Sequence, residues 1–182
     1  MQPLKYLLNW LLDHANPDHS LFTSADLRCL FPDLSDGAFN TLLSRAVDAE
    51  LLVKVCKKIY LFKKYYKNDG NLLFHVAGLL RSNHFNYVSL ETILSSCGVI
   101  SQVPMNWVSL MSSGRSNLIS CQEFGTIEFI HTTQKPTKIK DFLDYDQSTR
   151  LWHAHPQLAL RDMKRTNRNL DLINWEILNE LI

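Results

Sequence analysis

The residues best suited to chemistry in this chain are six lysines in residues 54–67, a segment that contains no acidic residue. They are Lys54, Lys57, Lys58, Lys63, Lys64 and Lys67. The net charge of the 182-residue chain is only +1, and no other stretch of it concentrates positive charge so strongly. A lysine ammonium holds phosphate as a point charge and does not read base sequence. The segment therefore predicts a local contact with nucleic-acid phosphates, and the near-neutral total argues against a non-specific coat of nucleic acid.

Histidines and acidic residues give weaker indications of a reactive site. His153 and His155 could share a metal only if a third ligand such as His131 met them, and partly exposed histidines are the simpler interpretation. Five acidic residues could supply the carboxylates of a nuclease. None of them, however, is followed two residues later by a lysine on the same strand, the spacing that a nuclease site usually has. They are Glu123, Glu128, Asp141, Asp144 and Asp146. With no Walker loop, GxGxxG, HExxH or GxSxG motif either, we expect no catalytic residue, metal or cofactor.

Two polar segments leave alternatives open. Residues 112–116 (SSGRS) could hold a phosphate in a glycine turn, or could simply form the loop of a hairpin. Lys164, Arg165 and Arg168 could contact a second phosphate or a partner, or could simply complement the negative end of a helix dipole.

The composition predicts a cytoplasmic protein without a membrane partner. Hydrophobic residues make up 46% of the chain, enough for a buried core, yet no apolar run approaches the roughly 18 residues that span a bilayer. Asp13 and His14 interrupt the segment that would be apolar in a signal peptide. The four cysteines lack metal-site spacing and predict reduced thiols.

Three short helices are expected before the lysine-rich segment. Leucines spaced for one helix face predict a helix over residues 4–15, and Thr23 or Ser24 can cap a second over 25–30. Ser35 or Asp36 can cap the third, whose buried stripe begins at Phe39. The other face of this third helix bears Asn40, Thr41, Ser44, Arg45 and Asp48. Such short polar side chains suit a helix that meets base edges in a major groove, although an ordinary solvated face has the same composition.

Residues 52–56 and 59–62 are β-rich runs separated by Lys57 and Lys58, which predicts a two-stranded hairpin with lysines at its tip. Three helices followed by a basic hairpin indicate a winged helix-turn-helix in residues 1–67, a fold that binds proteins in some cases and DNA in others. The predicted DNA-binding residues are Ser35, Asn40, Thr41, Ser44, Arg45, Lys54, Lys57, Lys58, Lys63 and Lys64.

A polar turn at residues 67–70 marks the expected domain boundary, and residues 68–182 predict a small mixed α/β domain. Helices are expected over 72–83 and 90–94, with Gly98 as a left-handed residue after the second. Short strands are expected over 107–110, 117–120 and 126–131, and helices from Pro156 and near the end of the chain. The fold class as a whole is α+β.

Five segments of the second domain, in this order, resemble the AbiEi family of bacterial antitoxins. The segments are residues 87–94 (YVSLETIL), 98–100 (GVI), 102–104 (QVP), 125–129 (GTIEF) and 154–162 (AHPQLALRD). The resemblance implies an amino-terminal winged helix that represses the protein's own promoter by binding inverted repeats in double-stranded DNA, as a monomer or weak dimer that binds cooperatively. It also implies the antitoxin of a type IV toxin–antitoxin system, used in abortive infection and phage defence, with a nucleotidyltransferase-like toxin as functional partner.

Three alternatives remain beside that interpretation. The chain could be a protein-interaction module that neutralises a toxin directly through its carboxy-terminal domain, or a general winged-helix transcriptional regulator. An enzyme that processes nucleic acid is the third, and the absence of a divalent-metal-dependent activity would separate it from the others.

Overall fold

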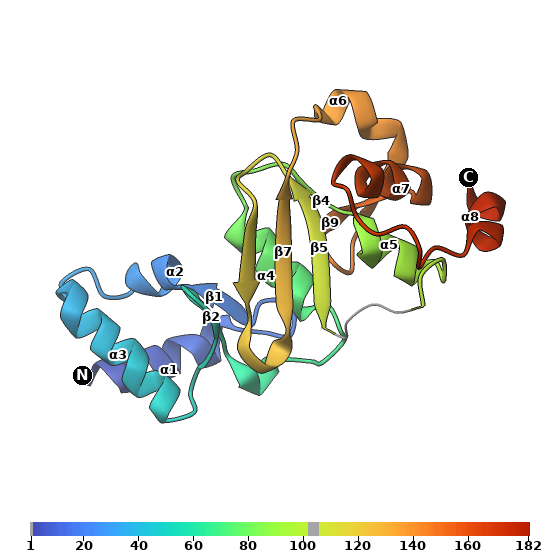
Figure 1. Ribbon diagram of the computed structural model, residues 1–182. Helices are drawn as coiled ribbons and strands as arrows, with labels where there is room; N and C mark the ends of the chain where they lie inside the picture. The colour runs from blue at the N-terminus through green and yellow to red at the C-terminus, as the bar shows by residue number, and fades with distance from the viewer. Residues whose placement is uncertain (1, 102–105) are drawn as a thin grey trace. The chain divides into compact units, whose positions relative to one another are not determined.

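A computed structural model describes residues 2–101 and 106–182, and the chain divides into two compact units, Met1–Asp69 and Gly70–Ile182. The described residues hold eight α-helices and two β-sheets, which confirms the predicted α+β class (Figure 1). The first unit ends at Asp69, two residues after Lys67, the last residue of the predicted first domain. No helix in the described ranges is both long and apolar enough to cross a membrane.

The first unit contains three helices and a three-stranded antiparallel sheet. Its elements are α1 (Pro3–His14), β1 (Leu21–Thr23), α2 (Ser24–Arg28), α3 (Asp36–Asp48), β2 (Val53–Cys56), β3 (Ile59–Leu61) and a 3-10 turn at Lys63–Tyr65. The strand order is β1-β3-β2, so the first strand pairs with the second arm of the hairpin. Leu7 and Leu11 of α1, Leu27 of α2 and Ala46 of α3 meet in one buried core.

Local capping explains where these helices begin. Thr23 and Asp26 form a reciprocal capping box, in which the Asp26 carboxylate accepts the Thr23 N–H at 2.8 Å and the Thr23 hydroxyl accepts the Asp26 N–H at 3.1 Å. Ser35 caps α3 by accepting the N–H of Ala38 at 3.3 Å. The three helices and the hairpin predicted in this unit are therefore confirmed, with Thr23 and Ser35 as the caps.

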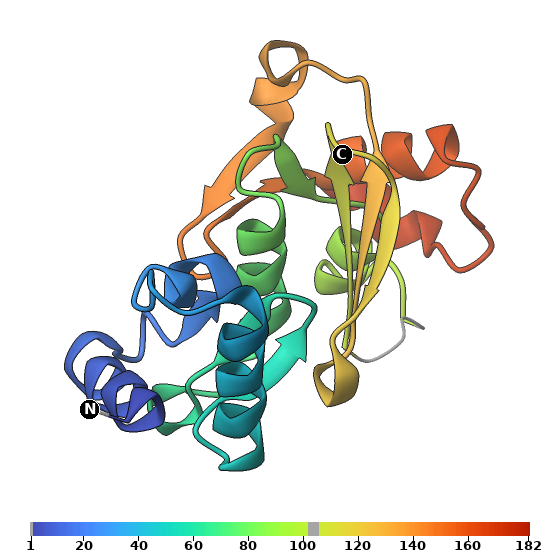
Figure 2. The same cartoon turned by 90° about the vertical axis from the view of Figure 1, so that its left-hand side faces the viewer.

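The second unit is built on a six-stranded mixed sheet in the order β6-β7-β5-β4-β9-β8. Its strands are β4 (Asn86–Val88), β5 (Trp107–Ser112), β6 (Asn117–Ser120), β7 (Thr126–His131), β8 (Leu143–Asp146) and β9 (Leu151–Ala154). Its helices are α4 (Leu72–Leu80), α5 (Leu90–Ser96), α6 (Pro136–Ile139), α7 (Pro156–Arg165) and α8 (Trp175–Leu181), with 3-10 turns at Gln122–Phe124 and Lys140–Phe142. Helix α5 packs against α7 and β5, and Figure 2 shows the unit from a second direction.

Two pairs of neighbouring strands in this sheet run parallel, β5 with β7 and β4 with β9, and the other pairs are antiparallel. The predicted strands β5, β6 and β7 are confirmed, whereas β8 and β9 were not predicted. Gly98 follows α5 with φ of +73°, the left-handed position expected for it. The segment 102–104 of the AbiEi resemblance lies outside the described residues.

Candidate nucleic-acid interface

The exposed face of α3 holds the residues predicted to read bases. Asn40 and Ser44 lie opposite the buried stripe that contains Phe39, Leu43 and Ala46, and both are exposed. Among the residues described, neither side chain has a hydrogen-bond or ionic partner. Their donors and acceptors are therefore available to an external ligand.

Thr41 and Arg45 belong to a different part of α3. They line a pocket that the start of α1 completes with Gln2, Pro3 and Leu4. The Thr41 hydroxyl also donates to the carbonyl of Gly37 at 2.9 Å within its own helix. Of the three residues predicted to read bases, Thr41 therefore lines the pocket beside α1 together with Arg45, which was predicted to dock on phosphate, whereas Asn40 and Ser44 do not line it.

Ser35 has a structural task in the first unit. Its side-chain oxygen accepts the N–H of Ala38, so one of the unpaired donors at the beginning of α3 is satisfied. The hydroxyl proton stays free to donate. Ser35 can thus support the orientation of α3 whether or not it touches a ligand.

The lysines do not form one continuous cluster. Lys57 and Lys58 occupy the turn between β2 and β3, and Lys54 lies on β2 opposite Tyr60. Lys63 and Lys64 belong to the 3-10 turn beyond the far end of β3. At roughly 3.3 Å per residue, five residues of extended chain separate Lys58 from Lys63 by about 16 Å. Lys57 and Lys58 therefore lie at one end of β3 and Lys63 and Lys64 at the other, with Lys54 beside its middle.

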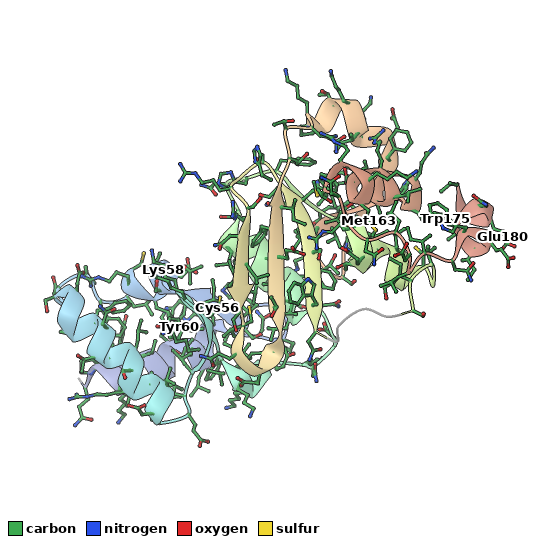
Figure 3. All side chains as sticks on the ribbon, viewed as in Figure 1. Cys56, Lys58, Tyr60, Met163, Trp175 and Glu180 are labelled. Atoms are coloured by element: carbon green, nitrogen blue, oxygen red, sulfur yellow. The ribbon has the colours of Figure 1, made fainter. Side chains whose placement is uncertain are left out.

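The hairpin turn is short and fixed to the sheet. Lys58 has φ of +69°, and its carbonyl accepts the N–H of Ser24 at 2.8 Å. Figure 3 labels Lys58 together with Cys56 and Tyr60, which lie on the two arms. A two-residue turn held in this way does not project far beyond the sheet, so Lys57 and Lys58 present charge at a defined position.

Charge is distributed unevenly along the first unit. Residues 1–50 contain three basic and seven acidic residues, whereas residues 51–69 contain six lysines and one aspartate. The lysines are exposed, and no acidic side chain in the described ranges forms an ion pair with Lys54, Lys57, Lys58, Lys63 or Lys64. Asp36 and Asp48 are exposed on α3 itself. An approaching polyanion is therefore attracted by the hairpin and the 3-10 turn and not by α3.

Arg168 is not part of an open basic patch with Lys164 and Arg165. Its guanidinium pairs with the Glu128 carboxylate at 2.5 Å and lies 3.8 Å from that of Glu91. Because its guanidinium already has two carboxylate partners, Arg168 is less available for the contact with a second phosphate that was one alternative for these three residues. Lys164 remains at the surface, with its ammonium 5.9 Å from the centre of the Trp175 ring.

A buried polar network in the second unit was missed by the sequence analysis. The Asp162 carboxylate accepts the hydroxyls of Tyr87 at 2.9 Å and Ser89 at 2.8 Å, and the side-chain amide of Gln134 at 2.8 Å. Burial raises the pKa of Asp162, and burial together with the neighbouring Asp162 carboxylate raises the pKa of the Tyr87 hydroxyl. A lone Asp among the buried leucines and Met163 of α7 was the available signal.

The histidines considered as metal ligands have other partners. His155 pairs with the Asp144 carboxylate at 2.9 Å, and His153 interacts with the Thr149 hydroxyl at 2.9 Å. No group of three His, Cys, Asp or Glu side chains suited to a metal occurs in the part of the chain that the structure describes.

No protein-family model matches the sequence, and no curated protein is significantly similar to it. The resemblance to the AbiEi family therefore depends on the five segments of this sequence alone.

Proposed function

We propose that the first unit is a winged helix-turn-helix and that it binds duplex DNA. The order helix, strand, helix, helix, strand, strand and the sheet order β1-β3-β2 support this proposal. The observation that carries it is the pairing, in one unit, of unpartnered hairpin lysines with an exposed polar face on α3. Lysines contribute affinity by neutralising phosphates, and Asn40 and Ser44 contribute discrimination at base edges.

We further propose that the chain is an AbiEi-like autorepressor and antitoxin of a type IV toxin–antitoxin system. Two of the five segments that resemble this family supply Tyr87, Ser89 and Asp162, which share one buried network. In this proposal the first unit binds inverted repeats in the protein's own promoter, as a monomer or weak dimer that is cooperative on DNA. The partner in function is a nucleotidyltransferase-like toxin, and the protein acts in the cytoplasm.

A gel-shift titration of the full chain against its own upstream DNA tests the DNA-binding proposal, with an unrelated duplex as competitor. If about five phosphates are neutralised, the logarithm of the association constant falls with the logarithm of salt concentration with a slope of roughly −4 to −5. Substituting Lys57→Glu and Lys58→Glu together should abolish most binding. The double variant Lys138→Glu and Lys140→Glu, which makes the same charge change in the second unit, should bind as the parent does. Salt-independent binding, or equal loss in both variants, would contradict the proposal.

The second candidate function is a protein-interaction module. The acidic residues Asp36 and Asp48 on α3 favour it, because they repel a phosphate backbone. Co-expression with the toxin separates the candidates. If the Lys57→Glu, Lys58→Glu variant loses operator binding and still protects cells, the hairpin serves DNA alone. If protection is lost while operator binding is retained, the hairpin serves a protein partner.

A further inference from the structure

We propose that the second unit carries a binding pocket for a phosphate group, formed where β5 and β7 end. The pocket is lined by Arg81, His84, Ser113, Arg115, Ser116 and His131, together with Gly114. This inference is independent of DNA binding by the first unit, because every residue in it belongs to the second unit.

The sheet topology explains why these residues meet. Strands β5 and β7 are parallel neighbours, and their last residues, Ser112 and His131, are register partners. Their carboxyl ends therefore lie at the same edge of the sheet, the position where open α/β sheets bind ligands. Strand β6 pairs with β7 and not with β5, so residues 112–116 are not the loop of a hairpin, as one alternative held.

Hydrogen bonds hold the loop after β5 against the loop after α4. The Ser113 N–H donates to the Phe85 carbonyl at 2.9 Å, and the Phe85 N–H donates to the Ser113 hydroxyl at 3.1 Å. Arg81 donates to the carbonyl of Arg115 at 2.6 Å, and its guanidinium lies 4.7 Å from the centre of the Phe129 ring. These two contacts favour a position of Arg81 at the pocket before any ligand binds, which lowers the entropic cost of binding.

The lining is basic although the second unit as a whole is neutral. Residues 70–182 contain ten lysines and arginines and ten acidic residues. The pocket nevertheless draws two arginines and two histidines from three separate segments, and its lining includes no acidic residue. Local positive charge of this kind selects an anionic ligand.

The pocket also offers hydroxyl donors. The Ser113 oxygen accepts the Phe85 N–H, and the Ser116 oxygen accepts the His131 N–H at 2.9 Å. Both hydroxyl protons therefore remain free to donate to a ligand. Two guanidinium groups and two hydroxyls match the several oxygens of a phosphate group, which guanidinium binds in a bidentate manner.

Gly114 makes room for this arrangement. A Cβ at this position would overlap the Arg81 guanidinium nitrogen Nη1, and it would lie 3.1 Å from Arg81 Cζ and 3.2 Å from His84 Cδ2. Gly114 is not among the glycines with positive φ, so the backbone itself would accept alanine. Glycine is therefore required at position 114 because a side chain would have no space beside Arg81, and not because of the backbone conformation of the turn.

Phosphate binding is tested with the full chain by calorimetry and by amide NMR, using inorganic phosphate, adenosine 5′-monophosphate and adenosine as probes. Phosphate and the nucleotide should bind and shift the amide signals of Gly114 and Ser116, whereas adenosine should not. Arg115→Gln should weaken binding by about 10-fold or more, as expected for a lost hydrogen bond to a charged group. Lys140→Gln removes the same charge outside the pocket and should change affinity less than about 2-fold.

Gly114→Ala supplies a test that leaves every charge in place. The added methyl group displaces a side-chain end that can move, so the protein should fold with little loss of stability, yet phosphate binding should weaken. A short single-stranded oligonucleotide then identifies the source of the phosphate. Binding of the oligonucleotide that depends on Arg115 indicates a nucleic-acid backbone, and nucleotide binding alone indicates a free phosphate ester. No binding of phosphate at 10 mM, or unchanged binding by both variants, would overturn the proposal.

Discussion

The hydroxyl of Tyr87 and the carboxylate of Asp162, 75 positions apart in sequence, form a hydrogen bond of 2.9 Å inside the second unit. Tyr87 lies on β4 and Asp162 on α7, and both side chains are buried. Ser89 joins the same carboxylate oxygen at 2.8 Å. The network thus ties the sheet to α7 and gives a structural reason for polar residues in two segments that resemble the AbiEi family.

Asp162→Ala should destabilise the second unit strongly. The change leaves the hydroxyls of Tyr87 and Ser89 and the amide of Gln134 without their shared acceptor in a buried site. We expect the free energy of unfolding to fall by roughly 3 kcal/mol or more, measured by urea denaturation. Asp162→Asn keeps an oxygen acceptor and should cost less than half as much. Equal stability of the alanine variant and the parent would show that the network does not contribute.

The ionisation of Asp162 should lower stability as the pH rises. Burial raises the pKa of this carboxyl in the folded protein above its unfolded value near 3.8. The folded state then binds more protons, so the favourable contribution is complete below about pH 4 and is lost as the pH rises through the folded pKa. The stability of the parent relative to Asp162→Asn should accordingly be greatest in acid. A difference that grows toward neutral pH would contradict this sign.

The ionisation of Asp146 should raise stability as the pH rises, the opposite of the effect expected for Asp162. Its carboxylate accepts hydrogen bonds from the Ser148 hydroxyl at 2.6 Å and from the N–H of Thr149 at 2.7 Å, which lowers its pKa to about 2. Its contribution is present above the unfolded pKa near 3.8 and disappears as the pH falls toward 2. Asp146→Asn should therefore be less stable than the parent at pH 6, and the two should converge near pH 2. Denaturation curves at a series of pH values provide the measurement, and a gap that persists at pH 2 would assign the loss to packing.

Local signals predicted the first unit well. The leucine spacing of α1, the caps Thr23 and Ser35, and the β-rich runs around Lys57 and Lys58 all act within a few residues. Such patterns are read directly from sequence because the interactions they describe are short-range. What the sequence did not show is β1, which pairs with β3 and adds a third strand to the hairpin.

The second unit was harder because its sheet is assembled from distant strands. Strand β7 lies between β5 and β6, an order that no local pattern encodes. Strand β8 is a mostly exposed edge strand that contains Asp144 and Asp146, so its hydrophobic signal is weak. The pairing of Arg168 with Glu91 and Glu128 joins three separate segments in the same way. The candidate phosphate pocket was visible only as the motif SSGRS, since Arg81 and His131 reach it through the tertiary fold.

Variants of Ser35 and Asn40 should separate the structural role of the α3 cap from the recognition of bases by α3. Ser35→Ala removes the cap of the helix, so the free energy of unfolding should fall by about 1 kcal/mol, and DNA affinity should weaken equally for the operator and an unrelated duplex.

Asn40→Ala changes an exposed side chain without a partner in the described residues, so stability should change by less than about 0.5 kcal/mol. If Asn40 reads a base, its variant should lose roughly 1 to 3 kcal/mol of discrimination between the two duplexes while the salt dependence stays the same. Gel-shift titrations of both variants at two salt concentrations make the comparison, with Asp48→Asn as a control on the same helix that should strengthen binding to both duplexes. Unchanged discrimination in Asn40→Ala would remove Asn40 from the proposed recognition of bases, and unchanged discrimination in the double variant with Ser44→Ala would leave the lysines as a non-specific contact.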